Sequence, residues 1–290
     1  MPTTMVSTDD PTVSYSNITP EERNRFQGGF PDDAEARIHS FLAWRKEHAL
    51  DGDNGRPPSE VDDAQVWSWA VRKAFEYHRP SVKKPAMTHR SVSVETQSTA
   101  KSSTSLTSPV TDGSLELPQV VFNHKVGSEY FRDKSGHRVL HILAARLDPS
   151  LADASLYATA IALYLDRVMD RKCPDQFTLL LDVRPGTGWC NLPALELVGF
   201  TRHVAGQLQT LFPERLHKCV LFPVPRPAVF LWNLFKVFLH ESTRQAVCVV
   251  AGGAHRDSPV PRSALRHHVP DVCVEHCEQV RLAHFVESSY

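Results

Sequence analysis

The densest group of side chains that could do chemistry lies near the C-terminus. Imidazole nitrogens and thiol sulfurs, the ligands that zinc prefers, occur together there. The residues are His267, His268, Cys273, His276 and Cys277. A tetrahedral zinc site usually shows two pairs of such residues, and this segment does not repeat that pattern. We therefore expect structural roles for these side chains and no metal site; an enzyme built on them would require a bound metal.

Other catalytic motifs are absent or incomplete. Gly186-Thr187-Gly188 lacks the Gly-Lys-Ser/Thr end of a phosphate-binding loop, so it predicts a turn. No Gly-x-Ser-x-Gly nucleophile elbow occurs in the sequence. Cys277 and Arg281 stand closer together than the cysteine and arginine of a phosphatase loop. The sequence predicts a protein that is not an enzyme and has no cofactor.

The composition is that of a globular protein. With 290 residues, 41% hydrophobic and 22% charged, the chain can form one large domain with accessory segments. A net charge of −1 provides no general basic field, so no nucleic-acid partner is expected. Residues 199–246 nevertheless hold six basic and two acidic residues. Such a surface would suit transient contact with an anionic membrane, and ordinary solvated charge explains it equally well.

The location of the protein is inferred from what the sequence lacks. No apolar run approaches the roughly 20 residues of a membrane span, and the N-terminus does not have the pattern of a signal peptide. The six cysteines are scattered, which favours reduced thiols over a disulfide scaffold. We expect a cytoplasmic protein with transient peripheral association with membranes.

The composition also divides the chain into segments. The first residues are polar and aperiodic, two amphipathic helices follow, and a Ser/Thr-rich stretch separates them from a longer apolar region. The predicted segments are a disordered tail (1–30), a small helical segment (31–79), a linker (80–117), the main domain (118–280) and a C-terminal tail (281–290).

Strands and helices alternate in the main domain. Strands are predicted at 137–144, 177–183, 218–224 and 246–251, and helices at 150–170 and 192–212. Strands separated by helices of this length form βαβ units. The expected fold is α/β, with a mixed or parallel sheet flanked by helices.

A third helix is unusual because it is apolar on almost every side. It starts at Pro227, a residue suited to the first helical turn, and lies between the last two predicted strands. It carries Phe230, Leu231, Leu234, Phe235 and Phe238. Such a helix is either buried in a core or in contact with something apolar that is not protein.

The order of these features resembles the CRAL-TRIO (Sec fourteen-like) family of lipid-binding proteins. The resemblance covers about residues 130–274, and more weakly 34–49, where SFLAWRKEHAL is similar to the end of the family's helical N-terminal domain. Five further segments resemble family motifs, in the family's order: DKSGHRVLHILAARLDPS, FTLLLDVRPG, FPERL, FKVFLHESTRQAV and ALRHHVPDVCVEHC, the last resembling the closing loop.

The resemblance implies a hydrophobic ligand cavity closed by a movable gate helix, here residues 228–239. The ligand-binding residues that it implies fall on one strand, on the Pro-Glu-Arg element, and on and after the gate. They are Phe177, Leu179, Leu181, Glu214, Phe230, Leu231, Leu234, Phe235, Phe238 and Thr243.

Several departures from the family pattern concern the ligand. Ala246 replaces the lysine that holds an inositol phosphate, and Phe177 and Leu179 replace the Ser and Thr of members that bind phosphatidylcholine. Val237 replaces the gate proline, and Cys277-Glu278 stands near the place of the closing Gly-Gly. These changes argue against exchange of the two phospholipids and favour a more apolar ligand or a partly filled pocket.

We therefore predict non-catalytic binding of a hydrophobic lipid in a gated cavity, with its transfer between membranes. The alternative is a scaffold of the same fold that has lost its ligand and binds other proteins. Native mass spectrometry distinguishes the two, because only the first contains a stoichiometric lipid.

Overall fold

The computed structural model describes residues 18–50, 62–78, 116–225, 241–253 and 255–287, together with residues 229 and 232. Most of the predicted gate helix and most of the predicted linker lie outside the described residues. So do residues 1–17 of the predicted N-terminal tail.

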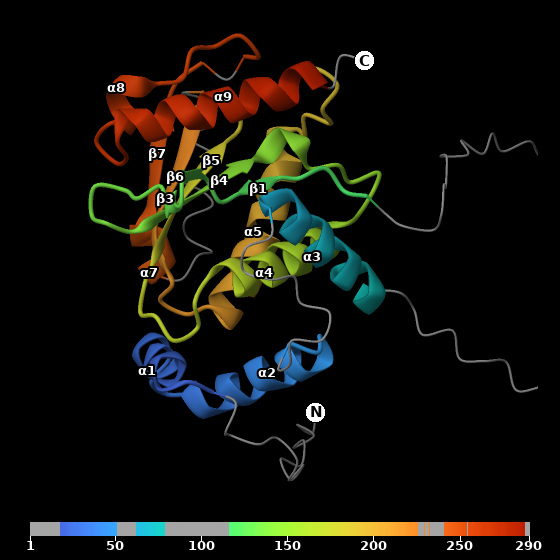
Figure 1. The fold of residues 1–290 in the computed structure, drawn as a ribbon, viewed down its shortest axis with the longest axis vertical. Helices are drawn as coiled ribbons and strands as arrows, with labels where there is room; N and C mark the ends of the chain where they lie inside the picture. Colours follow the sequence, from blue (N-terminus) through green and yellow to red (C-terminus); the bar gives the residue numbers. More distant parts are fainter. Residues whose placement is uncertain are drawn as a thin grey trace, which may run out of the picture.

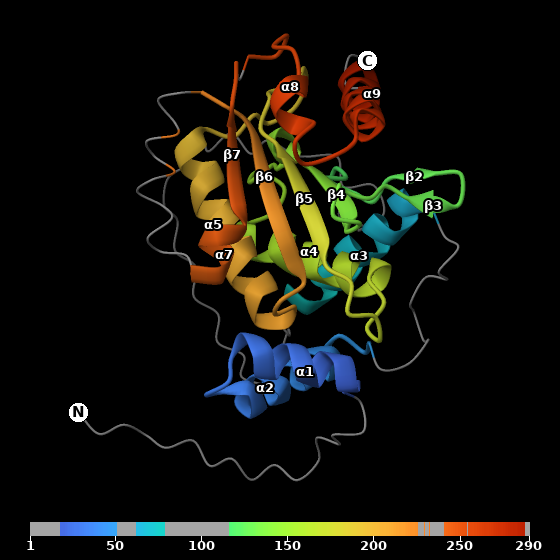
Figure 2. The ribbon, with the colours of Figure 1, turned by 90° about the vertical axis from the view of Figure 1, so that its left-hand side faces the viewer.

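A five-stranded mixed sheet forms the centre of the described structure, in the order β1-β4-β5-β6-β7. Figure 2 shows β4, β5, β6 and β7 side by side. Neighbouring strands from β4 to β7 are parallel, and β1 is antiparallel to β4. This confirms the predicted fold class, a mixed α/β sheet with flanking helices. The strands are β1 (Val121–Phe122), β4 (Arg138–Leu143), β5 (Phe177–Asp182), β6 (Leu216–Val224) and β7 (Val247–Ala251), and a separate hairpin pairs β2 (Lys125–Val126) with β3 (Glu129–Tyr130).

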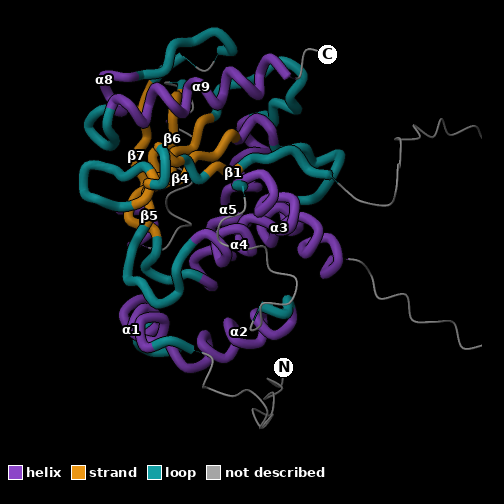
Figure 3. The backbone as a smooth tube through the Cα atoms, viewed as in Figure 1, coloured by secondary structure: helices purple, strands orange, loops and turns teal. Residues whose placement is uncertain are grey.

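Helices connect the parallel strands. Helix α4 (Ala154–Val168) joins β4 to β5, and α5 (Ala194–Leu211) joins β5 to β6. Each crossover leads to the next strand in the same direction across the sheet, so right-handed connections place these helices on one face. The short helix α7 (Glu241–Ala246) leads into β7. Figure 3 shows helices around the strands.

The opposite face of the sheet is covered by the C-terminal helices α8 (Arg262–Leu265) and α9 (Asp271–Glu287), so the sheet lies between α9 and α4 (Figure 1). This corrects two expectations, because α9 is a helix where a closing loop was predicted and it extends into the predicted tail 281–290. Cys273, Cys277 and Arg281 are buried and four residues apart, so they share one face of the helix. The Arg281 guanidinium, 2% exposed, donates to the Pro185 and Arg256 carbonyls.

Three helices precede the sheet. Helices α2 (Ala34–Glu47) and α3 (Asp63–His78) occur where two helices were expected. Helix α1 (Pro20–Gly29) was not expected, since residues 1–30 were predicted to be a disordered tail. Thr19 caps α1 and forms a capping box with Glu22. Its Phe26 is buried against Phe41 of α2, so the helix is held by packing.

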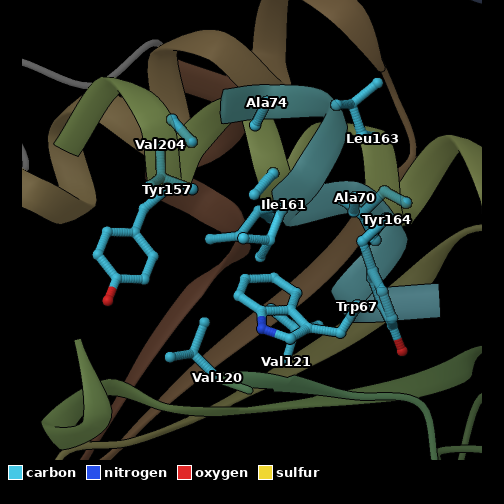
Figure 4. Close-up of a cluster of buried hydrophobic side chains, with 14 of the residues drawn as sticks. Trp67, Ala70, Ala74, Val120, Val121, Tyr157, Ile161, Leu163, Tyr164 and Val204 are labelled. Carbon is cyan, nitrogen blue, oxygen red and sulfur yellow. The ribbon is translucent and has the colours of Figure 1, made fainter. Parts of the chain in front are cut away.

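Helix α3 belongs to the core of the sheet domain. Trp67, Ala70 and Ala74 pack between α4 and the chain before β1 (Figure 4). The indole N–H of Trp67 donates to the Leu117 carbonyl at 3.2 Å. In contrast, α1 and α2 form a smaller cluster that meets α4 and α5 at Ala162 and Leu211.

Candidate ligand-binding face of the sheet

One face of the parallel strands presents almost only apolar side chains. Because side chains alternate along a strand, the pairing register assigns every second residue to the face covered by α4 and α5. This row consists of Leu140, Ile142, Phe177, Leu179, Leu181, Cys219, Leu221, Val247 and Val249. Arg138, at the start of β4, is the polar residue of the row, and its guanidinium donates to the Val168 carbonyl.

Burial decreases along this row from β4 to β7. Leu140 is 0% exposed and Phe177 3%, whereas Cys219, Leu221 and Val249 are only half-buried. On the opposite face, under α8 and α9, Val220 is 0% exposed. The incompletely covered apolar surface therefore lies on β6 and β7, the two strands joined by residues 225–246.

The polar side chains of β5 point to the other face. The Thr178 hydroxyl donates to an Asp133 carboxylate oxygen at 2.6 Å, and Asp182 accepts from Arg184 at 2.6 Å. On the candidate face, Cys219 acts as a small apolar residue. Among the described strand residues, the middle of this face carries no group that could bind a charged headgroup.

Of the predicted ligand residues on β5, all three lie on this face. Phe177 and Leu181, 3% and 7% exposed, are packed in the core beside α4. Leu179 is half-buried and closest to the open part of the row, because it pairs with Cys219 of β6.

Glu214 lies elsewhere, in the tight turn between α5 and β6. Its φ of +58° is rare for a residue with a side chain. Its carboxylate lies against the end of α1, where a Cβ on Gly28 would come within 2.8 Å of Oε2. Thr243 is in α7, which precedes β7. Because β6 and β7 are parallel, Glu214 and Thr243 both lie towards the end of the sheet at which these strands begin.

Sequence reasoning did not single out Arg215, the neighbour of Glu214. Arg215 is 3% exposed and donates to the carbonyls of Asp170 and Asp175, which fixes the turn to the loop before β5. Desolvation by burial lowers its pKa to about 10. The Pro-Glu-Arg element therefore has a structural role at the end of the sheet where β6 begins.

The predicted gate contacts lie outside the described residues: these are Phe230, Leu231, Leu234, Phe235 and Phe238. Within the predicted helix 228–239, Val229 and Trp232 are described, and both are helical and half-buried. The Val229 N–H donates to the Pro225 carbonyl at 3.2 Å, the bond of a first helical turn.

An open cleft of about 630 Å³ lies away from this face, among α2, α3, α4 and α5. Trp44, Tyr77 and Arg202 are among the residues that line it, and no strand residue does. Some of the polar side chains that line the cleft hydrogen-bond to one another, since the Thr159 hydroxyl interacts with His78 and Gln207. The cleft is therefore a separate surface from the apolar row of the sheet.

An α/β sheet with one incompletely covered apolar face is the architecture of a binding module for a hydrophobic molecule. The family comparison agrees with this class: the CRAL/TRIO domain model matches residues 123–271, more than half of the chain, and the protein belongs to this family. The family is known for lipid binding, and its domains are in general non-catalytic, which supports a role in binding a hydrophobic ligand.

Among solved structures, the chain is similar to the crystal structure of Sfh5, with 19% sequence identity and a TM-score of 0.32. The match covers 40% of this chain and 44% of that one, so it spans less than half of Sfh5. No curated protein matches the chain significantly. Among the described helices, none is long and apolar enough to cross a membrane.

Proposed function

We propose that the protein binds one hydrophobic molecule against the open part of the apolar row, on β5, β6 and β7, and carries it between membranes. The observation that supports this is the contrast between the faces of β6: Leu221 is half-buried on the face of α4 and α5, whereas Val220 is fully buried on the face of α8 and α9. An apolar surface left incompletely covered by protein favours an apolar ligand.

The affinity would come from burial of apolar surface. A fully buried aliphatic side chain contributes ~1.5–3 kcal/mol, so a side chain that is already largely buried has at most about 1 kcal/mol left to gain. Leu179, Cys219, Leu221, Val247 and Val249 together could supply less than about 5 kcal/mol from the sheet alone. Gate side chains on the other side of the ligand would add to this.

The proposed gate is the helix 228–239, which would move about hinges near Pro223–Pro227 and His240–Thr243. At a bilayer, lipid solvates its Phe and Leu side chains, so opening costs little. In water the same exposure is unfavourable, which keeps the ligand enclosed during transit. The excess of basic residues in 199–246 would favour transient contact with an anionic membrane in the cytoplasm.

The ligand that fits this face is an apolar lipid or the apolar part of one. The hydroxyl of Thr178 points away from the face, and apolar Phe177 and Leu179 stand on it. Neither the inositol phosphate nor the choline phosphate of the family's better-known ligands would find its usual partner on β5.

Native mass spectrometry of the full chain from a eukaryotic host, followed by solvent extraction and lipid identification, tests the proposal. We expect one stoichiometric lipid. Leu221→Asp on the sheet and Leu234→Asp on the predicted gate should both lose it. Leu151→Asp is the matched control, since Leu151 is 42% exposed and is not on the row.

Circular dichroism of each variant separates loss of ligand from loss of folding. A folded wild-type protein that stays empty after incubation with mixed liposomes would contradict lipid binding and would favour the protein-interaction module. A lipid that is retained in both Leu221→Asp and Leu234→Asp would place the ligand elsewhere, with the cleft among α2–α5 as the next candidate.

A further inference from the structure

On the opposite face of the sheet, three metal-binding side chains from distant parts of the chain come together. His124 follows β1, His141 lies on β4 and Cys277 is on α9. One ligand atom from each lies within 4.8 Å of the other two, and all three residues are buried. The site is independent of the proposed ligand-binding face.

The distances are close to those of a tetrahedral zinc site. Zinc–nitrogen bonds of about 2.0–2.1 Å and zinc–sulfur bonds of about 2.3 Å place neighbouring ligand atoms roughly 3.3–3.8 Å apart. His124 Nε2 and His141 Nδ1 are 3.2 Å apart, so the two imidazoles are nearly in place. The sulfur of Cys277 would have to approach the imidazole nitrogens by at most about 1.3 Å, a small side-chain adjustment.

His141 is the residue whose position is least explained by packing alone. Its imidazole is 0% exposed and hydrogen-bonds through Nδ1 to His124. Burying two adjacent imidazoles desolvates their polar nitrogens, so such a pair is an unfavourable choice for a purely apolar interface.

A fourth metal-binding side chain, Cys273, lies next to Cys277, outside the group of ligand atoms that are all within 4.8 Å of one another. Cys273 is 0% exposed and lies one helical turn before Cys277, and the two thiols hydrogen-bond to each other. Residues four apart on a helix share a face, so both sulfurs point from α9 towards the sheet. His276 is the remaining nearby candidate, with its ring 4.8 Å from that of His124, but it is less buried than Cys273.

A metal would bind each imidazole in its neutral form through one ring nitrogen and each cysteine as the thiolate. Zinc would displace the thiol protons to solvent, giving a neutral unit of one Zn²⁺, two thiolates and two imidazoles.

We propose that His124, His141, Cys273 and Cys277 form a structural zinc site that fixes helix α9 to the sheet. The sequence pointed to the two cysteines but not to the histidines, which lie more than 130 residues earlier. Of the histidines first grouped with these cysteines, His267 is exposed and takes no part. The site would fasten three segments that the chain joins only through long connections, as structural zinc does in other small domains.

The test uses the full chain, which is stripped with a chelator, reloaded with Zn²⁺ and dialysed. We expect the reloaded protein to hold one equivalent of Zn²⁺ by elemental mass spectrometry and to have a higher Tm than the stripped protein. Titration with Co²⁺ should give the visible bands of tetrahedral cobalt and a sulfur-to-cobalt charge-transfer band. Cys277→Ser and His124→Gln should weaken binding by at least about 100-fold, since even loss of residues outside the ligand shell costs 10–100-fold.

Matched controls use the same residue types at exposed positions: Cys190→Ser and His267→Gln should bind metal as the wild type does. X-ray absorption of the zinc-loaded wild type, which needs no variant, should report two nitrogen and two sulfur ligands. Absence of stoichiometric metal binding by the wild type would overturn the proposal. Binding unchanged in Cys277→Ser and His124→Gln, or an absorption spectrum without sulfur ligands, would overturn it as well.

Discussion

The substitution Asp166→Asn should reduce the free energy of unfolding by about 3–5 kcal/mol. Asp166 lies on α4 and forms an ion pair with Arg45 of α2, and the two residues are 2% and 0% exposed. Arg45 also donates from Nη2 to the Leu50 carbonyl at 2.9 Å. Asparagine keeps the shape of the side chain but removes the carboxylate charge that faces the buried guanidinium.

The magnitude follows from the degree of burial. An exposed ion pair is worth only ~0–1 kcal/mol because water screens it. Removing one partner of a fully buried pair exposes the desolvation cost of the other charge, which gives the larger value. Against a total stability of about 5–15 kcal/mol, this loss is severe. Replacing both charges together, Arg45→Met with Asp166→Leu, should recover most of it, because no uncompensated charge remains.

Urea unfolding followed by far-ultraviolet circular dichroism at fixed pH measures these differences. The control is Asp33→Asn, which removes an exposed pair with Arg37 and should change stability by less than ~1 kcal/mol. A cost below 1 kcal/mol for Asp166→Asn would refute the reasoning. So would a double variant as unstable as the single one, since the defect would then be lost packing and not unpaired charge.

Two further predictions concern stability. Burial raises the pKa of Asp63 from 3.8 to about 6, so the folded state binds a proton more readily than the unfolded chain does. The free energy of unfolding should therefore fall as the pH rises from about 4 to about 6. Asp63→Asn should abolish this dependence and stabilise the protein at pH 7 by at most about 3 kcal/mol; urea unfolding across this pH range checks it, and an unchanged pH profile would contradict it. Gly186→Ala should destabilise by roughly 1–3 kcal/mol, because the new Cβ would lie 2.2 Å from the Trp189 ring. Gly206→Ala in α5, where nothing lies within 4 Å, should instead stabilise by up to ~1 kcal/mol; thermal melts of the pair compare the two, and equal effects would disprove the steric argument.

Local pattern was enough to predict most of the elements. Strand β5 and helix α4 fall within one to four residues of the expected bounds, since continuous apolar runs and helical periodicity depend on neighbours in sequence. Helix α1 was missed even though Thr19 and Glu22 carry a capping signal, because a polar composition outweighed it. The resemblance to the family's closing loop predicts no helix here, whereas the buried residues Cys273, Cys277 and Arg281 recur every four residues, the spacing of the helix α9 that they form.

The sequence predicted only part of the candidate ligand-binding face. The family resemblance implied Phe177, Leu179 and Leu181 as ligand residues, but not that packing covers Phe177 and leaves Leu179 half-buried. Coverage depends on helices that reach the sheet from other parts of the chain. The gate residues lie outside the described part, so their contact with a ligand stays a prediction.

The sequence by itself determined the parallel strands β4 to β7, the helices between β4 and β6, their order, and the family to which the protein belongs, because hydrophobic periodicity and short motifs are local properties. Only the tertiary structure decided which side chains meet across long separations: Arg45 with Asp166, and His124 and His141 with Cys277. The reason is physical. Burial, which sets both the worth of an ion pair and the pKa of an imidazole, depends on what packs around a group, and that is fixed only when distant segments come together.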